Sequence, residues 1–278
     1  MEEGAWVKGM KRNEIKVCVP RVGGTNCDFE TQLAFKELGA RADVVHMNRL
    51  LRGDPSISSY DVLVFPGGFA HGDYVRAGAI WAKEMVARIG GELERFVDEG
   101  KPILGICNGF QVLVESGLLP GFGGIGQPAE ASLATNDSAR FECRWVYLRC
   151  ENRGKCPLVG ASPGQVLRMP VAHGEGKFIL DKARESLDKL IENDQIAFTY
   201  AKPSGERAGG AYPFNPNGSF EDIAGICNPQ GNVMGTMPHP ERCFYGWQLP
   251  DWQKKGLQPY GDGKLLFESI LKFVEKRF

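Results

Sequence analysis

A cysteine stands where an apolar strand passes into a helix. The apolar run Ile103–Ile106 is followed by Cys107, Asn108, Gly109 and a helical pattern. A nucleophile at such a turn projects from the C-terminal edge of a sheet, and the positive end of the helix favours its thiolate. The backbone N–H of Asn108 then points toward the position of a developing oxyanion. Taken alone, the pattern fits a buried cysteine in a strand–helix turn equally well.

A thiolate nucleophile needs a base, and the chain has four histidines. His239 directly follows the predicted strand Asn232–Thr236, and Glu241 comes two residues later. In an extended segment, residues two apart project to the same face, so the carboxylate can orient the imidazole. A proline-rich turn with a surface histidine would also explain this segment by itself. Together with Cys107, however, it predicts a Cys–His–Glu triad.

A second glycine turn follows the apolar run Val62–Phe65. Its sequence is Pro66-Gly67-Gly68-Phe69. Glycines let backbone N–H groups approach a substrate closely, so this turn can supply a second oxyanion donor. A tight strand exit is the alternative explanation. Asp73 and Arg76, just downstream, are expected either to pair locally or to face a partner.

The elements that would position these residues alternate along the first half of the chain. The strands predicted there are Ile15–Val19, Val44–His46, Val62–Phe65 and Ile103–Ile106. The helices predicted there are Phe29–Leu38, Ile80–Val97 with a break at Gly90-Gly91, and one through Phe110–Glu115 that stops at Gly117. This alternation predicts an α/β fold with an open, mostly parallel sheet and helices on both faces.

The second half has more strands and fewer helices, which predicts an added small antiparallel section. Strands are expected at Glu142–Arg149, Val166–Val171, Lys177–Leu180 and Gln195–Ala201, and a hairpin joins Ile223–Cys227 to Asn232–Thr236. An amphipathic helix over Lys264–Lys276 closes the chain. We expect residues 15–278 to form a single domain and residues 1–14 to be an N-terminal extension.

Composition excludes several classes of protein. Among 278 residues, 33 Lys and Arg stand against 34 Asp and Glu, unlike the basic excess of a nucleic-acid binder. No apolar run reaches the roughly 20 residues of a membrane span, and Met1–Arg12 lacks the apolar core of a secretory signal. We therefore expect a cytoplasmic protein that binds neither nucleic acid nor membrane. The eight cysteines form no C-x-x-C pair, so most are expected to be buried free thiols, without a structural zinc site.

Three motifs in chain order resemble those of the class I glutamine amidotransferases. They are Pro66–Phe69, Gly105–Gln111 and Pro238–Glu241. Further strings resemble the branch of that family that supplies ammonia in purine biosynthesis. These strings are Gly72–Tyr74, Asn136–Phe141, Ala172–Gly176, Asn215–Ser219 and Ile223–Asn228. The resemblance covers Ile15 to Arg242 and resumes in the last helix.

The resemblance implies a role for each matching residue. Cys107 would be the nucleophile, His239 the general base and acid, and Glu241 the partner that orients it. Glutamine would be bound by Gly67, Gly68, Phe69, Asn108, Gln111, His173 and Gly174. Gln111 lies one turn beyond Cys107, within reach of the α-substituents of glutamine. His173 is expected to be a binding or structural residue, not a second base.

The resemblance also implies partners. Glutamine would be hydrolysed through a thioester, and the ammonia would pass to a synthetase subunit that uses ATP and Mg²⁺ to aminate formylglycinamide ribonucleotide. A small accessory subunit is expected in the same complex. No cofactor or metal is expected on this chain, because Gly23-Gly24-Thr25-Asn26 lacks the lysine of a phosphate-binding loop.

The chain departs from shorter relatives at two further places. Ala70-His71 stands where many relatives carry Ser and Tyr, and Cys243–Asp262 adds an aromatic-rich segment before the last helix. We expect this segment either to contact the synthetase or gate the triad, or to fold back onto the last helix. Three alternatives to the whole interpretation stay open: an amidotransferase subunit of another synthetase, a different cysteine hydrolase, and a catalytically idle scaffold.

Overall fold

The computed structural model describes residues 9–278 and is built on a nine-stranded sheet, with a separate two-stranded sheet beside it. The strands are β1 (Lys16–Arg21), β2 (Arg41–His46), β3 (Val62–Phe65), β4 (Ile103–Ile106), β5 (Ala131–Thr135), β6 (Glu142–Cys150), β7 (Val166–His173), β8 (Glu175–Leu180), β9 (Ile196–Ala201), β10 (Ile223–Cys227) and β11 (Val233–Thr236). The helices are α1 (Asp28–Glu37), α2 (Met47–Leu50), α3 (Ala79–Asp98), α4 (Asn108–Glu115), α5 (Ala183–Glu192), α6 (Trp252–Lys255) and α7 (Lys264–Arg277).

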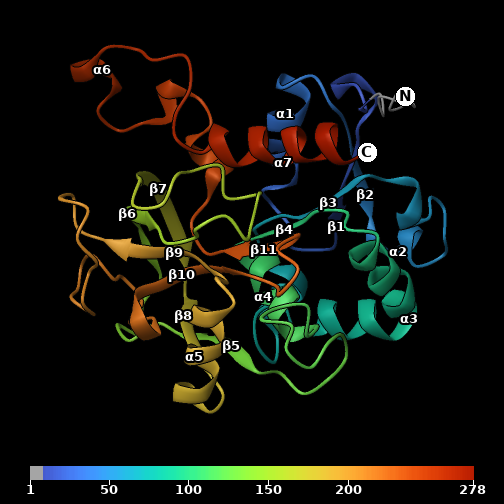
Figure 1. The fold of residues 1–278 in the computed structure, drawn as a ribbon, viewed down its shortest axis with the longest axis horizontal. Helices are drawn as coiled ribbons and strands as arrows, with labels where there is room; N and C mark the ends of the chain where they lie inside the picture. Colours follow the sequence, from blue (N-terminus) through green and yellow to red (C-terminus); the bar gives the residue numbers. More distant parts are fainter. Residues whose placement is uncertain (1–8) are drawn as a thin grey trace, which may run out of the picture.

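The parallel half of the large sheet brings the three motifs to one edge. Strand order is β2-β1-β3-β4-β11-β10-β9-β6-β7, and the first five strands run parallel. Phe65 pairs with Gly105, and Ile106 pairs with Thr236. The chain segments that leave β3, β4 and β11 therefore start side by side. Helices α1 and α7 cover one face of this half, and α3 and α4 cover the other (Figure 1).

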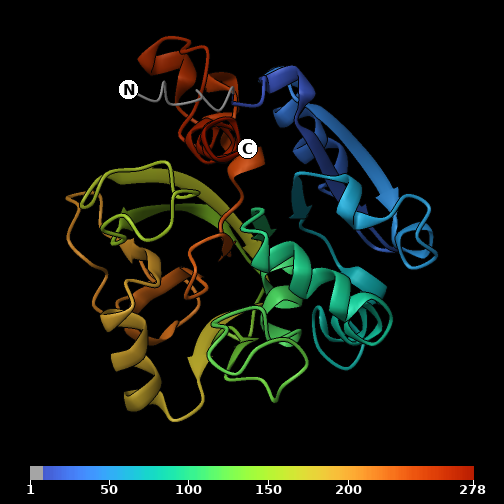
Figure 2. The ribbon, with the colours of Figure 1, turned by 45° about the vertical axis from the view of Figure 1, so that its right-hand side comes forward.

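The antiparallel section has two parts. β10, β9, β6 and β7 extend the large sheet, and β5 pairs with β8 in the small sheet. Figure 2 shows the blue N-terminal strands on one side and the yellow-to-orange strands on the other, with α7 above the line where they meet. The predicted fold class is confirmed, including the hairpin of β10 and β11.

The structure differs from the predicted elements in two respects. The break predicted at Gly90-Gly91 lies one residue earlier in the structure: α3 is kinked at Ile89, whose φ of −133° and ψ of 19° are non-helical. The prediction also missed β5 and α5. Strand β5 buries only Ala131 and Leu133, and α5 buries only Ser186 and Leu190. Strand β5 therefore carries too narrow an apolar pattern to stand out in the sequence, whereas α5 has Leu187, Leu190 and Ile191 at helical spacing and could have been recognised.

Aromatic side chains fill the core on both faces of the sheet. Phe35 of α1 packs edge-on against Phe267 of α7, with 5.1 Å between ring centroids, and Phe65 packs against Trp81 at 5.6 Å. The predicted extension is tied to α7 where it is described, because the Arg12 guanidinium bonds Glu275 at 2.8 Å. Residues 1–8 of that extension lie outside the described residues.

The aromatic-rich segment Cys243–Asp262 is divided between core and surface. Phe244 is buried and its ring lies 5.8 Å from that of Phe267, so the base of the segment packs on α7. Trp247, by contrast, is 57% exposed. The prediction that the segment folds back onto the last helix is confirmed for the base of the segment. Contact with a synthetase stays a prediction.

All eight cysteines are free, and seven of them are buried. The exception is Cys143 on β6. Between residues 9 and 278 no helix is both long and apolar enough to span a membrane.

Candidate active site

Cys107 occupies a strained turn between β4 and α4. Its backbone has φ 51° and ψ −106°, a conformation that residues with a side chain rarely adopt. Two glycines make room for the turn: a Cβ on Gly105 would lie 2.6 Å from a leucine methyl group, and a Cβ on Gly109 would collide with the end of β3. The turn holds the thiol at the C-terminal edge of the sheet. Because Cys107 is only 4% exposed, a substrate must reach it through a narrow opening.

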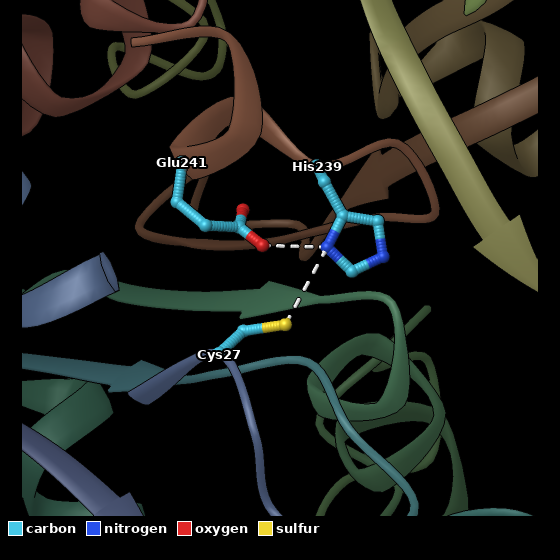
Figure 3. Close-up of side chains that lie close together, drawn as sticks. All are labelled: Cys27, His239 and Glu241. Atoms are coloured by element: carbon cyan, nitrogen blue, oxygen red, sulfur yellow. Dashed lines mark hydrogen bonds and ion pairs between the residues drawn. The ribbon is translucent and has the colours of Figure 1, made fainter. Parts of the chain in front are cut away.

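His239 and Glu241 follow β11 at the same edge and are buried. Nδ1 of His239 lies 2.5 Å from Oε1 of Glu241 (Figure 3), and the backbone N–H of His239 donates to the Pro170 carbonyl at 2.8 Å. The other ring nitrogen, Nε2, has no hydrogen-bond partner within residues 9–278. The carboxylate therefore orients the ring and leaves Nε2 free for chemistry.

The buried imidazole and carboxylate hold opposite charges. Burial by itself would lower the pKa of His239, but the charges of Glu241 and Cys107 outweigh burial and hold that pKa well above its ordinary value of 6.5. Burial would raise the pKa of Glu241, and the nearby imidazolium outweighs it, so that this pKa is lowered. The carboxylate and the imidazolium therefore stabilise each other's charged forms.

The glycine turn after β3 packs directly on the imidazole. A Cβ on Gly67 would lie 2.7 Å from Cε1 of His239, so any side chain there would displace the ring. Gly68 has φ 152°, and a Cβ on it would lie 2.8 Å from the Gly24 carbonyl oxygen. That same carbonyl accepts the N–H of Phe69 at 2.9 Å. Within the described residues the N–H of Gly68 makes no hydrogen bond, so it is available to a ligand.

Polar side chains form a connected cluster over the first turn of α4. Asn108 Nδ2 donates to Gln111 Oε1 at 2.8 Å, and Gln111 Nε2 donates to the Glu175 carbonyl at 2.6 Å. Asp73 Oδ1 lies 3.4 Å from Asn108 Nδ2. Burial, with the charge of Glu175, raises the pKa of Asp73 to about 6. The cluster fixes Asn108 and Gln111 and adds two carboxylates that the predicted site did not include.

Arg76 does not pair with Asp73. Its guanidinium makes a two-pronged bond to the buried carboxylate of Glu115, with both N–O distances at 2.6 Å. The local pairing considered for Asp73 and Arg76 is therefore wrong. The reason is geometric: Glu115 ends α4 directly beneath Arg76, whereas Asp73 turns toward Asn108.

His173 is buried at the end of β7 and is neutral. Its Nδ1 lies 3.1 Å from Asn136 Oδ1, and its ring covers Gly176, where a side chain would collide with it. Burial, with the positive charge of His239, lowers the pKa of His173 to about 3. The Gly174 carbonyl accepts the N–H of Asn136 at 2.9 Å. These contacts make His173 a fixed part of the loop.

Phe69 lies at the surface next to this loop. Its side chain is 43% exposed, and its ring centroid is 6.0 Å from that of Phe141, which is also exposed. The two rings lie at the rim of the site, not inside it.

Cys27 is the residue beside the imidazole that the sequence did not reveal. It comes from the β1–α1 turn, 212 residues before His239, and its Sγ lies 4.0 Å from His239 Nδ1 (Figure 3). Arg242 Nη2 lies 3.0 Å from the same sulfur. Burial raises the pKa of the Cys27 thiol to about 11. The available signal was the glycine turn Gly23–Asn26 at the end of the first strand, which had been considered only as a phosphate loop.

The fold that carries this site is that of a known family. Residues 14–274 match the family described as the CobB/CobQ-like glutamine amidotransferase domain, and the chain belongs to that family. It is 47% identical to the phosphoribosylformylglycinamidine synthase subunit PurQ of Archaeoglobus fulgidus, over 96% of this chain and all of the relative. It is 43% identical to PurQ of Methanococcus maripaludis, over 92% of each chain.

A solved structure extends the likeness to three dimensions. A chain of PurLQS from Thermotoga maritima superimposes with a TM-score of 0.68 at 33% identity, covering 93% of this chain and 98% of the other.

Proposed function

We propose that this chain is the glutaminase subunit of a phosphoribosylformylglycinamidine synthase. The observation that carries the proposal is the buried His239–Glu241 pair beside Cys107, held on the strained turn of an amidotransferase fold. The likeness to PurQ proteins over nearly the whole chain supports the particular synthase.

The reaction begins at the thiol of Cys107. Its proton passes to Nε2 of His239, and the thiolate attacks the side-chain amide carbon of glutamine to form a tetrahedral intermediate. The free N–H of Gly68 and the first N–H of α4, from Asn108, hold the negative oxygen. His239 then returns the proton to the amide nitrogen as the carbon–nitrogen bond breaks. Ammonia leaves, and the glutamyl group remains on sulfur as a thioester.

Water completes the cycle. His239 takes a proton from the water as its oxygen attacks the thioester carbon, and the same oxyanion donors stabilise the second intermediate. Collapse of that intermediate expels the sulfur of Cys107, which regains its proton from the imidazolium, and glutamate leaves. Glu241 keeps Nδ1 oriented throughout and stabilises the imidazolium.

The polar cluster over α4 recognises the amino-acid end of glutamine. Gln111 lies one turn beyond the nucleophile, and the carboxylates of Asp73 and Glu175 suit an α-ammonium group. Gly67, Phe69 and the His173-Gly174 loop shape the rest of the pocket, with His173 in a positioning role. Support comes from the cluster's position next to Cys107 and from the raised pKa of Asp73, which a cation would lower.

Ammonia made here requires an acceptor subunit. We infer that the chain assembles with an ATP- and Mg²⁺-dependent synthetase subunit and a small accessory subunit, because it resembles a chain of PurLQS. Formylglycinamide ribonucleotide would be activated and aminated on the synthetase. All eight cysteines are free thiols, which suits work in the reducing cytoplasm.

The test reconstitutes the chain with the synthetase and accessory subunits of its own organism. Formation of the amidine product is measured with glutamine and, separately, with ammonium. Cys107→Ala is expected to abolish the glutamine-driven reaction and to leave the ammonium-driven reaction intact. Cys143→Ala, at the exposed cysteine on β6, is the matched control and should retain both reactions. Loss of the ammonium-driven reaction in Cys107→Ala would contradict the division of labour.

A further inference from the structure

We propose that Cys27, His239 and Glu241 form a binding site for a soft divalent cation of the zinc class, and that this cation switches the glutaminase off. The three side chains offer a sulfur, an imidazole nitrogen and a carboxylate oxygen, all within 4.8 Å of one another. All three residues are buried. Figure 3 shows the sulfur and the carboxylate directed at the same ring nitrogen, Nδ1. Thiolate, imidazole and carboxylate are the ligands that Zn²⁺ uses in proteins.

The distances require only small movements. Around a tetrahedral Zn²⁺ ion, sulfur and nitrogen ligands lie about 3.5 Å apart, and nitrogen and oxygen ligands about 3.3 Å apart. Cys27 Sγ is 4.0 Å from Nδ1, and Glu241 Oε1 is 2.5 Å from it. The ion would take the place of the Nδ1 proton, drawing the sulfur inward and pushing the carboxylate outward. Asn26, exposed and with its Oδ1 3.1 Å from the sulfur, marks the side from which a cation enters.

An unused ligand atom points to the same site. Glu241 Oε2 is buried and has no hydrogen-bond partner within the described chain, 9–278. A buried carboxylate oxygen without a partner is costly. When the ion separates Oε1 from Nδ1, this second oxygen gives the carboxylate another atom with which to bind.

Arg242 is the cation that competes for these ligands. Its Nη2 lies 3.0 Å from Cys27 Sγ, and its Nε lies 3.9 Å from Glu241 Oε1. The side chain is partly exposed and also reaches Glu30, at 3.7 Å, on α1. Arg242 can therefore turn toward Glu30 when a divalent ion takes its place. Until then, its charge favours the thiolate that the ion needs.

Occupation of the site and glutamine hydrolysis exclude each other. An imidazole that gives its Nδ1 lone pair to a metal carries its proton on Nε2. Nε2 is the atom that accepts the proton of Cys107 in the proposed reaction, so the base is blocked. This inhibitory consequence rests on the proposed function, whereas the binding site itself does not.

The first experiment measures binding without activity. Co²⁺ is titrated into the Cys107→Ala variant, which removes the nucleophile as a competing ligand, and the sulfur-to-cobalt charge-transfer band is recorded. We expect one equivalent to bind with this band. The Cys107→Ala/Cys27→Ser double variant should lose it, because serine keeps the side-chain size without a thiolate. The Cys107→Ala/Cys243→Ala variant is the matched control, since Cys243 Sγ lies 3.5 Å from the His239 carbonyl, and it should keep the band.

Two outcomes of the cobalt titration would overturn the site. One is a band that persists after Cys27→Ser, which would assign the metal to another thiol. The other is the absence of any band in Cys107→Ala with Co²⁺ in large excess. Circular dichroism of each variant verifies that the fold is intact.

The second experiment measures inhibition. Zn²⁺, held at defined free concentrations by a chelator, is added to the complete synthase complex while glutamate release is followed. Cys27→Ser should remain active and require at least about 10- to 100-fold more Zn²⁺ for half inhibition, because loss of a direct ligand costs no less affinity than loss of an outer-shell partner. Unchanged inhibition would overturn the regulatory part of the proposal. Absence of glutaminase in the parent complex would instead contradict the proposed function, and the cobalt result would still decide the site.

Discussion

Cys27 and Cys107 have much in common. Each caps the N-terminus of a helix that follows a parallel strand, and each lies beside the imidazole of His239. Their backbones differ: Cys27 has φ −106°, whereas Cys107 is held at φ 51° between two obligatory glycines. They also differ in which nitrogen of the imidazole is open to them. Cys27 lies near Nδ1, which is already bonded to Glu241, whereas Nε2 has no partner among the described residues and is the nitrogen that the proposed reaction assigns to Cys107.

The comparison shows how far a helix N-terminus can offset the effect of burial on the pKa of a thiol. Burial holds the pKa of Cys27 at about 11 although the residue occupies the N-cap position of α1 and its thiol lies near an imidazole and an arginine. A helix dipole contributes at most about 2 kcal/mol, too little to overcome full burial. We therefore expect nucleophilic function at this sheet edge to require the strained turn and a ring nitrogen with no other partner. A capping position alone is insufficient.

The largest expected effect is the difference in glutaminase activity between substitutions of the two cysteines. Cys107→Ser should reduce glutamate release by at least about 10⁴-fold, because the attacking thiolate is lost. Cys27→Ser should stay within about tenfold of the parent, because a side chain of similar size leaves the imidazole in position. Glutaminase assays on the complete complex measure both. Comparable losses in the two variants would mean that both sulfurs take part in the reaction.

Glu241 contacts the imidazole at Nδ1, the nitrogen next to which Cys27 also lies. Glu241→Gln should lower kcat by about 10²- to 10⁴-fold, because the ring loses the charge that stabilises its protonated form. Glu241→Asp, which keeps the charge on a shorter side chain, is the control and should lose less. If the two variants lost activity equally, position and not charge would be the contribution of Glu241.

The same substitution should change stability in a defined pH window. The pKa of His239 is raised in the folded protein. Its contribution to folding stability is therefore complete below pH 6.5 and is lost as the pH rises through the higher folded-state pKa. The pKa of Glu241 is lowered, so its contribution is complete above 4.5 and is lost as pH falls through the lower folded-state value. Thermal unfolding of Glu241→Gln should therefore differ most from the parent between pH 4.5 and 6.5. A difference independent of pH would contradict the ion pair.

Gly67 tests the packing that both cysteines share through His239. A methyl group there would lie 2.7 Å from the imidazole and 3.2 Å from Cys27 Sγ. Gly67→Ala should lower kcat by about 10- to 100-fold by displacing the ring, and should cost about 1–3 kcal/mol of stability. Gly91→Ala is the control, because within the described chain no atom beyond its sequence neighbours and the backbone of its own helix lies within 4 Å of the new methyl group. In the middle of α3 it should stabilise the protein slightly.

The sequence predicted the Cys107 side of the imidazole and missed the Cys27 side, for a physical reason. Around Cys107, the strand, the turn glycines and the helix are contiguous, so a local pattern reports them. His239 and Glu241 are two residues apart, so their joint orientation is also local. Cys27 meets His239 only because β1 and β11 end at the same edge of the sheet, and no spacing along the chain encodes that contact.

The same distinction between local patterns and long-range contacts explains which elements of the fold were predicted. Buried parallel strands such as Val62–Phe65 were predicted at their observed bounds, because each is a continuous apolar run between turn residues. Strand β5 was missed, because it is short and half polar and, within residues 9–278, pairs only with β8. The surroundings of Asp73 were missed for a similar reason: Glu175, whose charge adds to burial in raising its pKa, belongs to β8, and Asn108, whose amide lies 3.4 Å from its carboxylate, belongs to α4.

The smallest expected effect concerns Asp73, on the Cys107 side of the imidazole. Its pKa is raised to about 6, first by burial and then by the charge of Glu175. The stability that the protonated carboxyl contributes to the fold is therefore complete below pH 3.8 and is lost as the pH rises through about 6. Asp73→Asn does not titrate, so its advantage in Tm should grow between pH 4 and 6 and stay constant above. Because the carboxylate is half exposed and partly screened, we expect a gain of only about 1–3 °C at pH 8. Asp137→Asn, which removes an exposed carboxylate 2.6 Å from Lys177, is the control and should give no gain. A fall in Tm for Asp73→Asn at pH 8 would mean that the ionised carboxylate stabilises the loop, and its place in the glutamine pocket would then have to be reconsidered.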